Sequence, residues 1–186
     1  VFTLVNKSPW GAGTFSSDLR LSLMNDYGNA KGGKIDNRAL QGLLGYAYKG
    51  HSLGLAYQRM LGDTGYANIL GADANLINLS VLGDFANAKE RSWALRYGYD
   101  FANLGLPGLS INSRYISGSH AEITGTRTIG KSWELDNELR YVVQQGPLKN
   151  LSVRLRTAHY RSNYAKNFIR DTDDTRLMFN YAWNIK

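Results

Sequence analysis

The 186-residue chain contains no cysteine, only three prolines and no long hydrophobic run. Without cysteine it can form neither a disulfide scaffold nor a thiolate metal site. No apolar run approaches the roughly 18 residues that a membrane-spanning helix needs, and the mean hydropathy is -0.36. The three histidines, His51, His120 and His159, lack metal-ligand spacing, and no serine, histidine and acid set carries a nucleophile motif. The sequence therefore predicts no enzyme, no metal site and no cofactor.

Aromatic residues and glycine are abundant, with 12 tyrosines, 4 tryptophans and 20 glycines, which favours β structure. The clearest pattern lies between Lys131 and Arg161, where two runs alternate apolar and polar side chains about the turn QGPLKN. The apolar face carries Trp133, Leu135, Leu139, Tyr141, Val143, Leu151, Val153 and Leu155. The polar face carries Glu134, Asp136, Glu138, Arg140, Arg154 and Arg156. A period of two residues predicts a long β-hairpin.

The same alternation recurs along the chain, and it predicts nine strands, of which the first is incomplete. Besides the two strands of the hairpin, we expect strands at 1–6, 14–26, 38–49, 51–61, 90–101, 109–118 and 174–185. Short turns (KSPWGAG, Lys49-Gly50, ANLGLPG and QGPLKN) alternate with longer polar segments near 27–37, 62–89, 119–130 and 162–173. We interpret LINLSVL, at 76–82, as part of the long segment 62–89, because an extra crossing would break this alternation.

One face of these strands carries arginines and acids, whereas the other is apolar with aromatic residues toward its ends. This contrast suits a strand between an aqueous lumen and lipid, so we predict an all-β, transmembrane antiparallel β-barrel with short periplasmic turns and long external loops. The inward arginines are Arg20, Arg96, Arg114, Arg140, Arg154, Arg156 and Arg176. The aromatic girdle would contain Trp93, Trp133, Trp183, Tyr99 and Phe101, and Ile185 would also face outward. Because nine is odd, residues 1–186 are expected to be one domain, the C-terminal half of a larger barrel.

Several long segments resemble the OprD family of substrate-specific outer-membrane channels of pseudomonads. They are GLAYQRMLGDTGY, DFANAKERSWALRYGYDFANLGLPGLSINSRY, SWELDNELRYVVQQGPLKNLSVRLRTAHYRS and DTRLMFNY. The resemblance covers most of the chain from about Asn37 onward. It implies an 18-stranded monomeric barrel in the bacterial outer membrane, in contact with its lipid and lipopolysaccharide, of which the nine strands would be the last nine.

The resemblance also implies a ladder of arginines that passes small carboxylate nutrients along the pore. Arginine suits this role because its planar, permanently charged group fits a carboxylate. The alternative is that several arginines are permanently paired with wall acids, namely Asp18, Asp100, Glu134, Asp136 or Glu138. The segment 62–89 would fold inward and narrow the pore, with Asp84 and Asp63 facing the ladder and Tyr66 and Asn78 as neutral partners.

The net charge of +7 raises a different possibility, a soluble basic β-domain that binds nucleic acid or an acidic partner. Such a domain would expose aromatic residues beside arginines on one face. Here they lie on opposite faces, so we expect no nucleic-acid partner. An outer-membrane hydrolase would need a serine and histidine pair at the rim, and none is evident.

Overall fold

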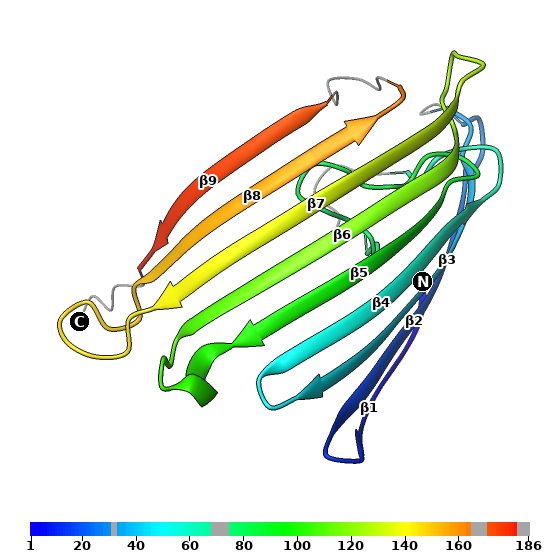
Figure 1. Cartoon of the computed structure of the whole chain (residues 1–186). Coiled ribbons are helices and arrows are strands. Elements are labelled where there is room, and N and C mark those ends of the chain that lie inside the picture. Colours follow the sequence, from blue (N-terminus) through cyan, green and yellow to red (C-terminus); the bar gives the residue numbers. More distant parts are fainter. Residues whose placement is uncertain (31–32, 68–74, 165–170, 182–186) are drawn as a thin grey trace.

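The computed structural model of the chain describes residues 1–30, 33–67, 75–164 and 171–181. These residues form one antiparallel sheet in which each strand pairs with the next in chain order (Figure 1). The strands are β1 (Phe2–Trp10), β2 (Gly13–Asn25), β3 (Asp36–Tyr48), β4 (His51–Leu61), β5 (Arg91–Asp100), β6 (Leu109–Glu122), β7 (Ile129–Val142), β8 (Ser152–Ser162) and β9 (Thr172–Asn180). A single 3-10 turn, η1 (Phe101–Leu104), joins β5 to β6. The all-β, antiparallel prediction is confirmed.

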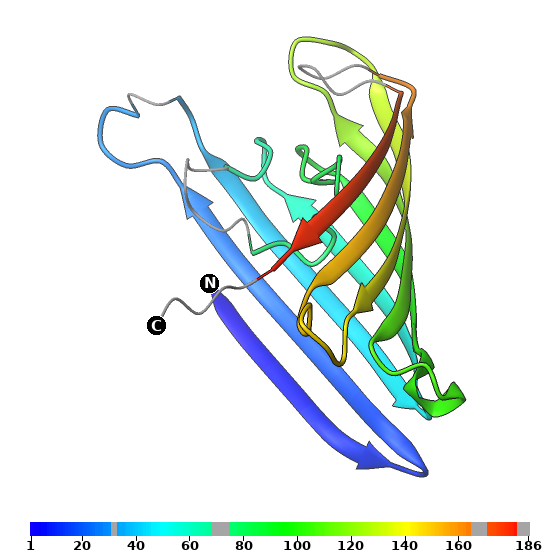
Figure 2. The same cartoon turned by 90° about the vertical axis from the view of Figure 1, so that its left-hand side faces the viewer.

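The sheet curves across its width, so that it has a concave and a convex face (Figure 2). The segment between β4 and β5 lies on the concave side, and β1 and β9 form the two edges of the sheet (Figures 1 and 2). No helix in the described part of the chain is long and apolar enough to cross a membrane. The sheet forms a curved wall, and the loop between β4 and β5 partly fills its concave side.

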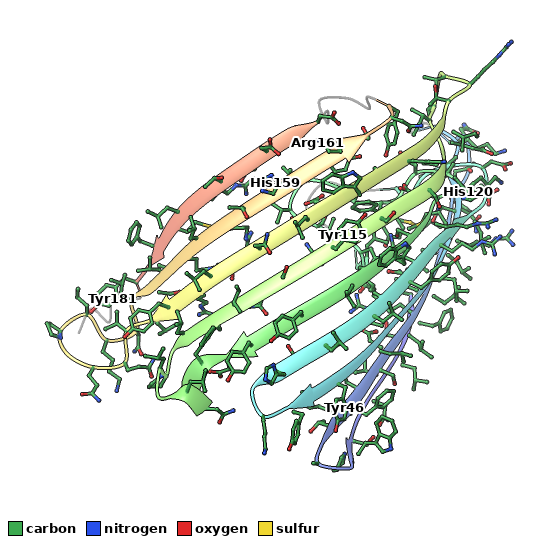
Figure 3. All side chains as sticks on the ribbon, in the orientation of Figure 1. Tyr46, Tyr115, His120, His159, Arg161 and Tyr181 are labelled. Atoms are coloured by element: carbon green, nitrogen blue, oxygen red, sulfur yellow. The ribbon has the colours of Figure 1, made fainter. Side chains whose placement is uncertain are left out.

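The convex face is apolar and exposed along the middle of the strands. It carries Leu40, Leu44, Leu53, Leu55, Tyr57, Trp93, Leu95, Leu139, Leu155 and Leu177, all of them at least 36% exposed. Aromatic rings lie on this face both near a strand end, as Tyr46 does, and in mid-strand, as Tyr115 does (Figure 3). Tyr115 lies 5.5 Å from Trp93 and 6.1 Å from Trp133 between ring centroids. Exposed leucines bordered by aromatic rings are what a lipid-facing surface requires.

The strand register confirms the predicted faces. Leu95 lies opposite Leu55 and Tyr115, and Leu139 lies opposite Leu155. Each inward arginine is adjacent in sequence to such an outward residue, as Arg96 is to Leu95. Because successive strand residues point to opposite faces, all seven predicted inward arginines lie on the concave face. Trp183 and Ile185 lie outside the described residues.

Several predicted boundaries are wrong. The first strand continues to Trp10 and ends in a two-residue turn at Gly11, where φ is +58°. The sequence KSPWGAG looked like a loop because of its proline and glycines, but Pro9 lies on an edge strand, where its missing N–H is tolerated. Strand β6 continues beyond Gly118 to Glu122 through a β-bulge at which His120 has a φ of +60°. The bulge absorbs one extra residue and lets pairing resume at Ala121.

Candidate functional site

Six of the seven concave-face arginines lie in cross-strand pairs at successive levels of the wall, whereas Arg20 lies opposite Gln41. Arg96 of β5 is opposite Arg114 of β6, and Arg156 of β8 is opposite Arg176 of β9. One level closer to the short turns, Arg140 of β7 is opposite Arg154 of β8. Adjacent levels on one face are two residues apart, which is roughly 7 Å. Like charges placed opposite each other repel, so each pair needs carboxylates or bound anions nearby.

Acids on the same face neutralise most of this charge. Within the described residues, five of the seven arginines form ion pairs with acids of the concave face. These pairs are Arg20–Asp18 at 2.6 Å, Arg114–Asp136 at 2.6 Å, Arg154–Glu138 at 2.8 Å, Arg156–Glu138 at 2.6 Å and Arg176–Asp174 at 2.8 Å. Four of these arginines thus pair with acids that were predicted from the sequence as possible partners, whereas the partner of Arg176, Asp174, was not among them. The paired side chains of Arg114, Arg154 and Arg156 remain 23–28% exposed, so solutes can still reach them.

Two of the acids expected to pair with arginines have other partners. Asp100 accepts a hydrogen bond of 2.9 Å from the backbone N–H of Ala102 and caps η1. Glu134 is completely buried and accepts hydrogen bonds from the Ser80 hydroxyl and from the backbone N–H groups of Leu82 and Gly83, at 2.6, 2.9 and 2.7 Å. Asp100 thus shapes a turn, and Glu134 holds the loop.

The described residues of the loop between β4 and β5 pack against the concave face and form no additional strand of the sheet. Leu76 and Ile77 are buried there, and residues 75–82 form turns and bends. Gln41 accepts a hydrogen bond of 2.7 Å from the N–H of Ile77, and Gln58 accepts one of 3.0 Å from the N–H of Asn78. The prediction that LINLSVL does not cross the membrane and folds against the wall is confirmed.

Three arginines also donate to this loop, a contact that the sequence did not reveal. Arg96 donates to the carbonyl of Ile77, Arg114 donates to the carbonyl of Leu79 at 2.8 Å, and Arg20 donates to the Asn75 side chain at 2.7 Å. Gln41, Gln58 and Glu134, which hold the loop from the wall, were not predicted as site residues either. One feature of the sequence could have revealed these three residues. Each is a long polar side chain on the inward face of a strand that precedes or follows a long loop.

A cavity of about 540 Å³ lies beside Ser80 and Val81 of the loop, and three arginines line it. Its polar lining includes Arg96, Arg114, Arg156, Asp136, Glu138, Asn112 and Ser80. Gly45, Gly54 and Gly98 line it as well. A Cβ atom added at Gly98 would lie 2.6 Å from the Ser52 hydroxyl and 2.8 Å from the Asn112 side chain, so glycine keeps this space open. Arg20, Arg140, Arg154 and Arg176 do not line the cavity.

The loop residues predicted to face the ladder do not do so. Asp63 forms an exposed ion pair of 2.8 Å with Lys89, and the hydrogen bond from Lys89 lowers the pKa of Asp63. Asn78 is completely buried and donates to the Ser92 hydroxyl at 3.0 Å. Its amide therefore anchors the loop and cannot contact a solute. A prediction of side-chain direction failed here because irregular loops have no fixed period.

Asp84 and Tyr66 also lie away from the cavity. Asp84 lines a separate space of about 20 Å³ with Tyr160 and Tyr164. Tyr66 packs against a small core that includes Met60 and Ala86. The acids that face the central arginines are Asp136 and Glu138 of the wall. The described residues contain no group of three or more histidines and acids that could hold a metal ion.

A family model described as "outer membrane porin, OprD family" matches residues 2–185. The chain is 30% identical over 185 residues to porin-like protein GalP of Pseudomonas putida, an alignment that covers 99% of this chain and 43% of the relative. Among solved structures it resembles Pseudomonas aeruginosa OccK10 (OpdN), with 44% identity and a TM-score of 0.91 over 98% of this chain and 52% of the other.

Two further Pseudomonas aeruginosa structures contain small molecules. OccK2 (OpdF) in complex with glucuronate is 35% identical, with a TM-score of 0.90 over 95% of this chain and 48% of the other. OpdK with vanillate is 40% identical, with a TM-score of 0.89 over 96% and 46%. The chain thus spans about half the length of the proteins that it matches.

Proposed function

Because the chain belongs to the OprD family of outer membrane porins, we propose that it forms part of the wall of a channel that selects small carboxylate solutes. The nine strands would belong to a larger closed barrel. β1 and β9 are sheet edges, and an unpaired edge is not tolerated in the hydrocarbon core of a membrane. The solutes would cross on the concave side, past the tip of the inward loop, in a barrel that acts as a monomer.

The observation that carries this proposal is the charge of the central cavity. Arg96, Arg114 and Arg156 line it, while Asp136 and Glu138 are its only acids among the lining residues described. Glu138 is in addition shared between Arg156 and Arg154. Arg96 forms no ion pair with any carboxylate in the described part of the chain. A cavity with surplus guanidinium groups attracts anions, and a carboxylate can accept two parallel N–H donors from one guanidinium.

The wall acids help transport because they limit how tightly an anion is held. A solute carboxylate that reaches Arg156 competes with Glu138 for the same N–H donors. The solute therefore binds weakly and is released quickly. A path of several moderate sites suits conduction better than one deep site. Arg140 with Arg154, then Arg156 with Arg176, then Arg96 with Arg114 would be successive sites. Glucuronate and vanillate, seen in complexes of two relatives, are both carboxylates, which supports this class of solute.

The test is the double replacement Arg154→Gln and Arg156→Gln in the full-length protein. Both arginines donate to Glu138 and to no described residue of the loop, so the replacements are expected to change the charge without releasing the loop. In phosphatidylcholine liposomes we expect carboxylate influx to fall about fivefold or more, consistent with loss of charged hydrogen bonds. Influx of a neutral sugar of equal size should stay the same or rise.

The matched control is Arg59→Gln with Arg91→Gln, which removes two arginines from the convex face and should leave both fluxes unchanged. At 1 M salt, where the Debye length is about 3 Å, the difference between wild type and the Arg154 and Arg156 variant should shrink. An equal fall for carboxylate and sugar in that variant would show that these arginines only support the wall, and would contradict the proposal.

A further inference from the structure

A second set of cations lies on the convex face, at the end of the sheet where the long loops are. Arg59 of β4 is directly opposite Arg91 of β5, and Lys131 of β7 lies on the same face. None of these three side chains forms an ion pair within the described residues. Arg161 of β8, by contrast, is held by Asp173 at 2.8 Å. Two arginines opposite each other without an acid are destabilising unless an anion lies between or beside them.

Their depth is fixed by the aromatic residues below them. Arg59, Arg91 and Lys131 each lie two residues from an aromatic side chain on the same face, namely Tyr57, Trp93 and Trp133. Two strand residues span roughly 7 Å. Tryptophan and tyrosine mark the boundary between hydrocarbon and headgroups in membrane proteins. The three cations therefore lie at the level of the lipid headgroups, on the side of the long loops.

A hollow lies beside strand β6, with Lys131 in its lining and Arg91 on the other side of β6, opposite Ser119. Ser117 is opposite both Trp93 and Trp133, and Ser119 is opposite Arg91. A hollow of about 590 Å³ on this surface is lined by Ser117, Ser119, Lys131, Trp133 and Arg161, among others. The β-bulge after Gly118 brings His120 beside it, with His120 Nδ1 at 3.1 Å from the Ser119 hydroxyl. His120 and Arg161 are labelled at this end of the sheet in Figure 3.

We propose that this hollow, together with Arg91 on the other side of β6, binds a phosphorylated headgroup of an outer-leaflet lipid. Arg91 and Lys131 supply the positive charge, and an acyl chain lies over Ser117 between Trp93 and Trp133. The hydroxyl of Ser119 donates to the backbone carbonyl of Arg91 over a long 3.4 Å and becomes a further donor to the phosphate when it rotates. Arginine and lysine both bind phosphate well, the first through its planar fork and the second as a compact charge. Arg161 is already paired with Asp173. The positive charge available to a phosphate therefore comes from Arg91 and Lys131, which form no ion pair within the described residues. The proposal rests on the membership of an outer-membrane family, and it does not depend on which solute the channel carries.

The test measures binding of lipid A by the full-length protein in detergent, using native mass spectrometry. The probes are diphosphorylated lipid A and the same lipid after removal of its phosphates. The variant is Arg91→Gln with Lys131→Gln, and the control is Arg154→Gln with Arg156→Gln, which removes the same charge from the concave face. We expect the variant to bind diphosphorylated lipid A about tenfold more weakly, and the control to stay within about twofold of wild type. Binding of the phosphate-free lipid should be equal for all three proteins.

Lys131→Gln alone provides a milder test in case the double variant does not fold, and we expect it to weaken binding about threefold. Heat-dependent migration in gels confirms a folded barrel for each protein. Unchanged affinity of a folded variant for diphosphorylated lipid A would overturn the proposal, as would an equal loss for the phosphate-free lipid. Displacement of the lipid by inorganic phosphate would identify a site for soluble anions and would equally overturn it.

Discussion

The two faces of one strand give neighbouring residues opposite surroundings. On β5, Leu95 is 46% exposed on the convex face, whereas Arg96, the next residue, donates to the carbonyl of Ile77 on the concave face. Charge on the concave side is met by Asp136, Glu138 and loop carbonyls, whereas the middle of the convex side carries leucines. Within the described strands, the arginines and lysines of the convex face lie toward the long loops. The comparison indicates that charge in this sheet is placed beside an acid, a loop carbonyl or water, and away from the leucines in the middle of the convex face.

The largest effect is expected when a charge is moved to the wrong face. Leu95→Arg places a cation in the middle of the lipid-facing surface and should cost about 2–4 kcal/mol of folding free energy. The control is Asn112→Arg, which adds the same charge to the exposed concave face opposite Glu138. We expect the control to stay within about 1 kcal/mol of wild type. Urea titration of the full-length barrel in lipid vesicles measures both, and equal losses would mean that the two faces do not differ as described.

A smaller effect is expected when the acid that holds the loop is neutralised. Glu134→Gln keeps the shape of the side chain but turns one acceptor oxygen into a donor, which would face groups that already donate, such as Ser80 and Gly83. Leaving these buried donors without an acceptor should weaken loop docking by about 2 kcal/mol. We expect larger and noisier single-channel conductance and faster proteolysis within the loop. Glu122→Gln, at an exposed strand end, is the control, and a conductance equal to wild type for Glu134→Gln would contradict the role of Glu134.

The smallest effect concerns the exposed pair Asp63–Lys89 at the base of the loop. Lys89 lowers the pKa of Asp63 below its ordinary value of 3.8, chiefly through their hydrogen bond. Since the folded-state pKa is the lower one, the stabilisation is present above pH 3.8 and is lost as the pH falls through the lowered value. Asp63→Asn should therefore differ slightly from wild type in loop proteolysis at pH 7, and the difference should shrink as the pH falls below 3.8. A larger difference at low pH than at pH 7 would contradict this assignment.

The local sequence was sufficient to predict the strands and their faces. Leu95 and Arg96 could be assigned to opposite sides because alternation depends only on the pleat of a single strand. The sequence also predicted that the loop folds inward. A further membrane crossing by LINLSVL would have broken the alternation of short turns and long loops, so this segment had to belong to the loop. The first strand and β6 were predicted too short because a proline on an edge strand and a bulge near His120 do not end pairing.

The partner of each charge was decided only by the tertiary structure. Glu138 lies between Arg154 and Arg156 because β7 and β8 pair in one register, and a register cannot be deduced from either strand alone. Glu134, one of several acids on the same face, meets the loop and no arginine because of the path that residues 80–83 follow. Asp63 and Asn78 were misplaced for the same reason. Alternation is a local property of the chain, whereas ion pairs and loop contacts depend on distances between segments far apart in the sequence.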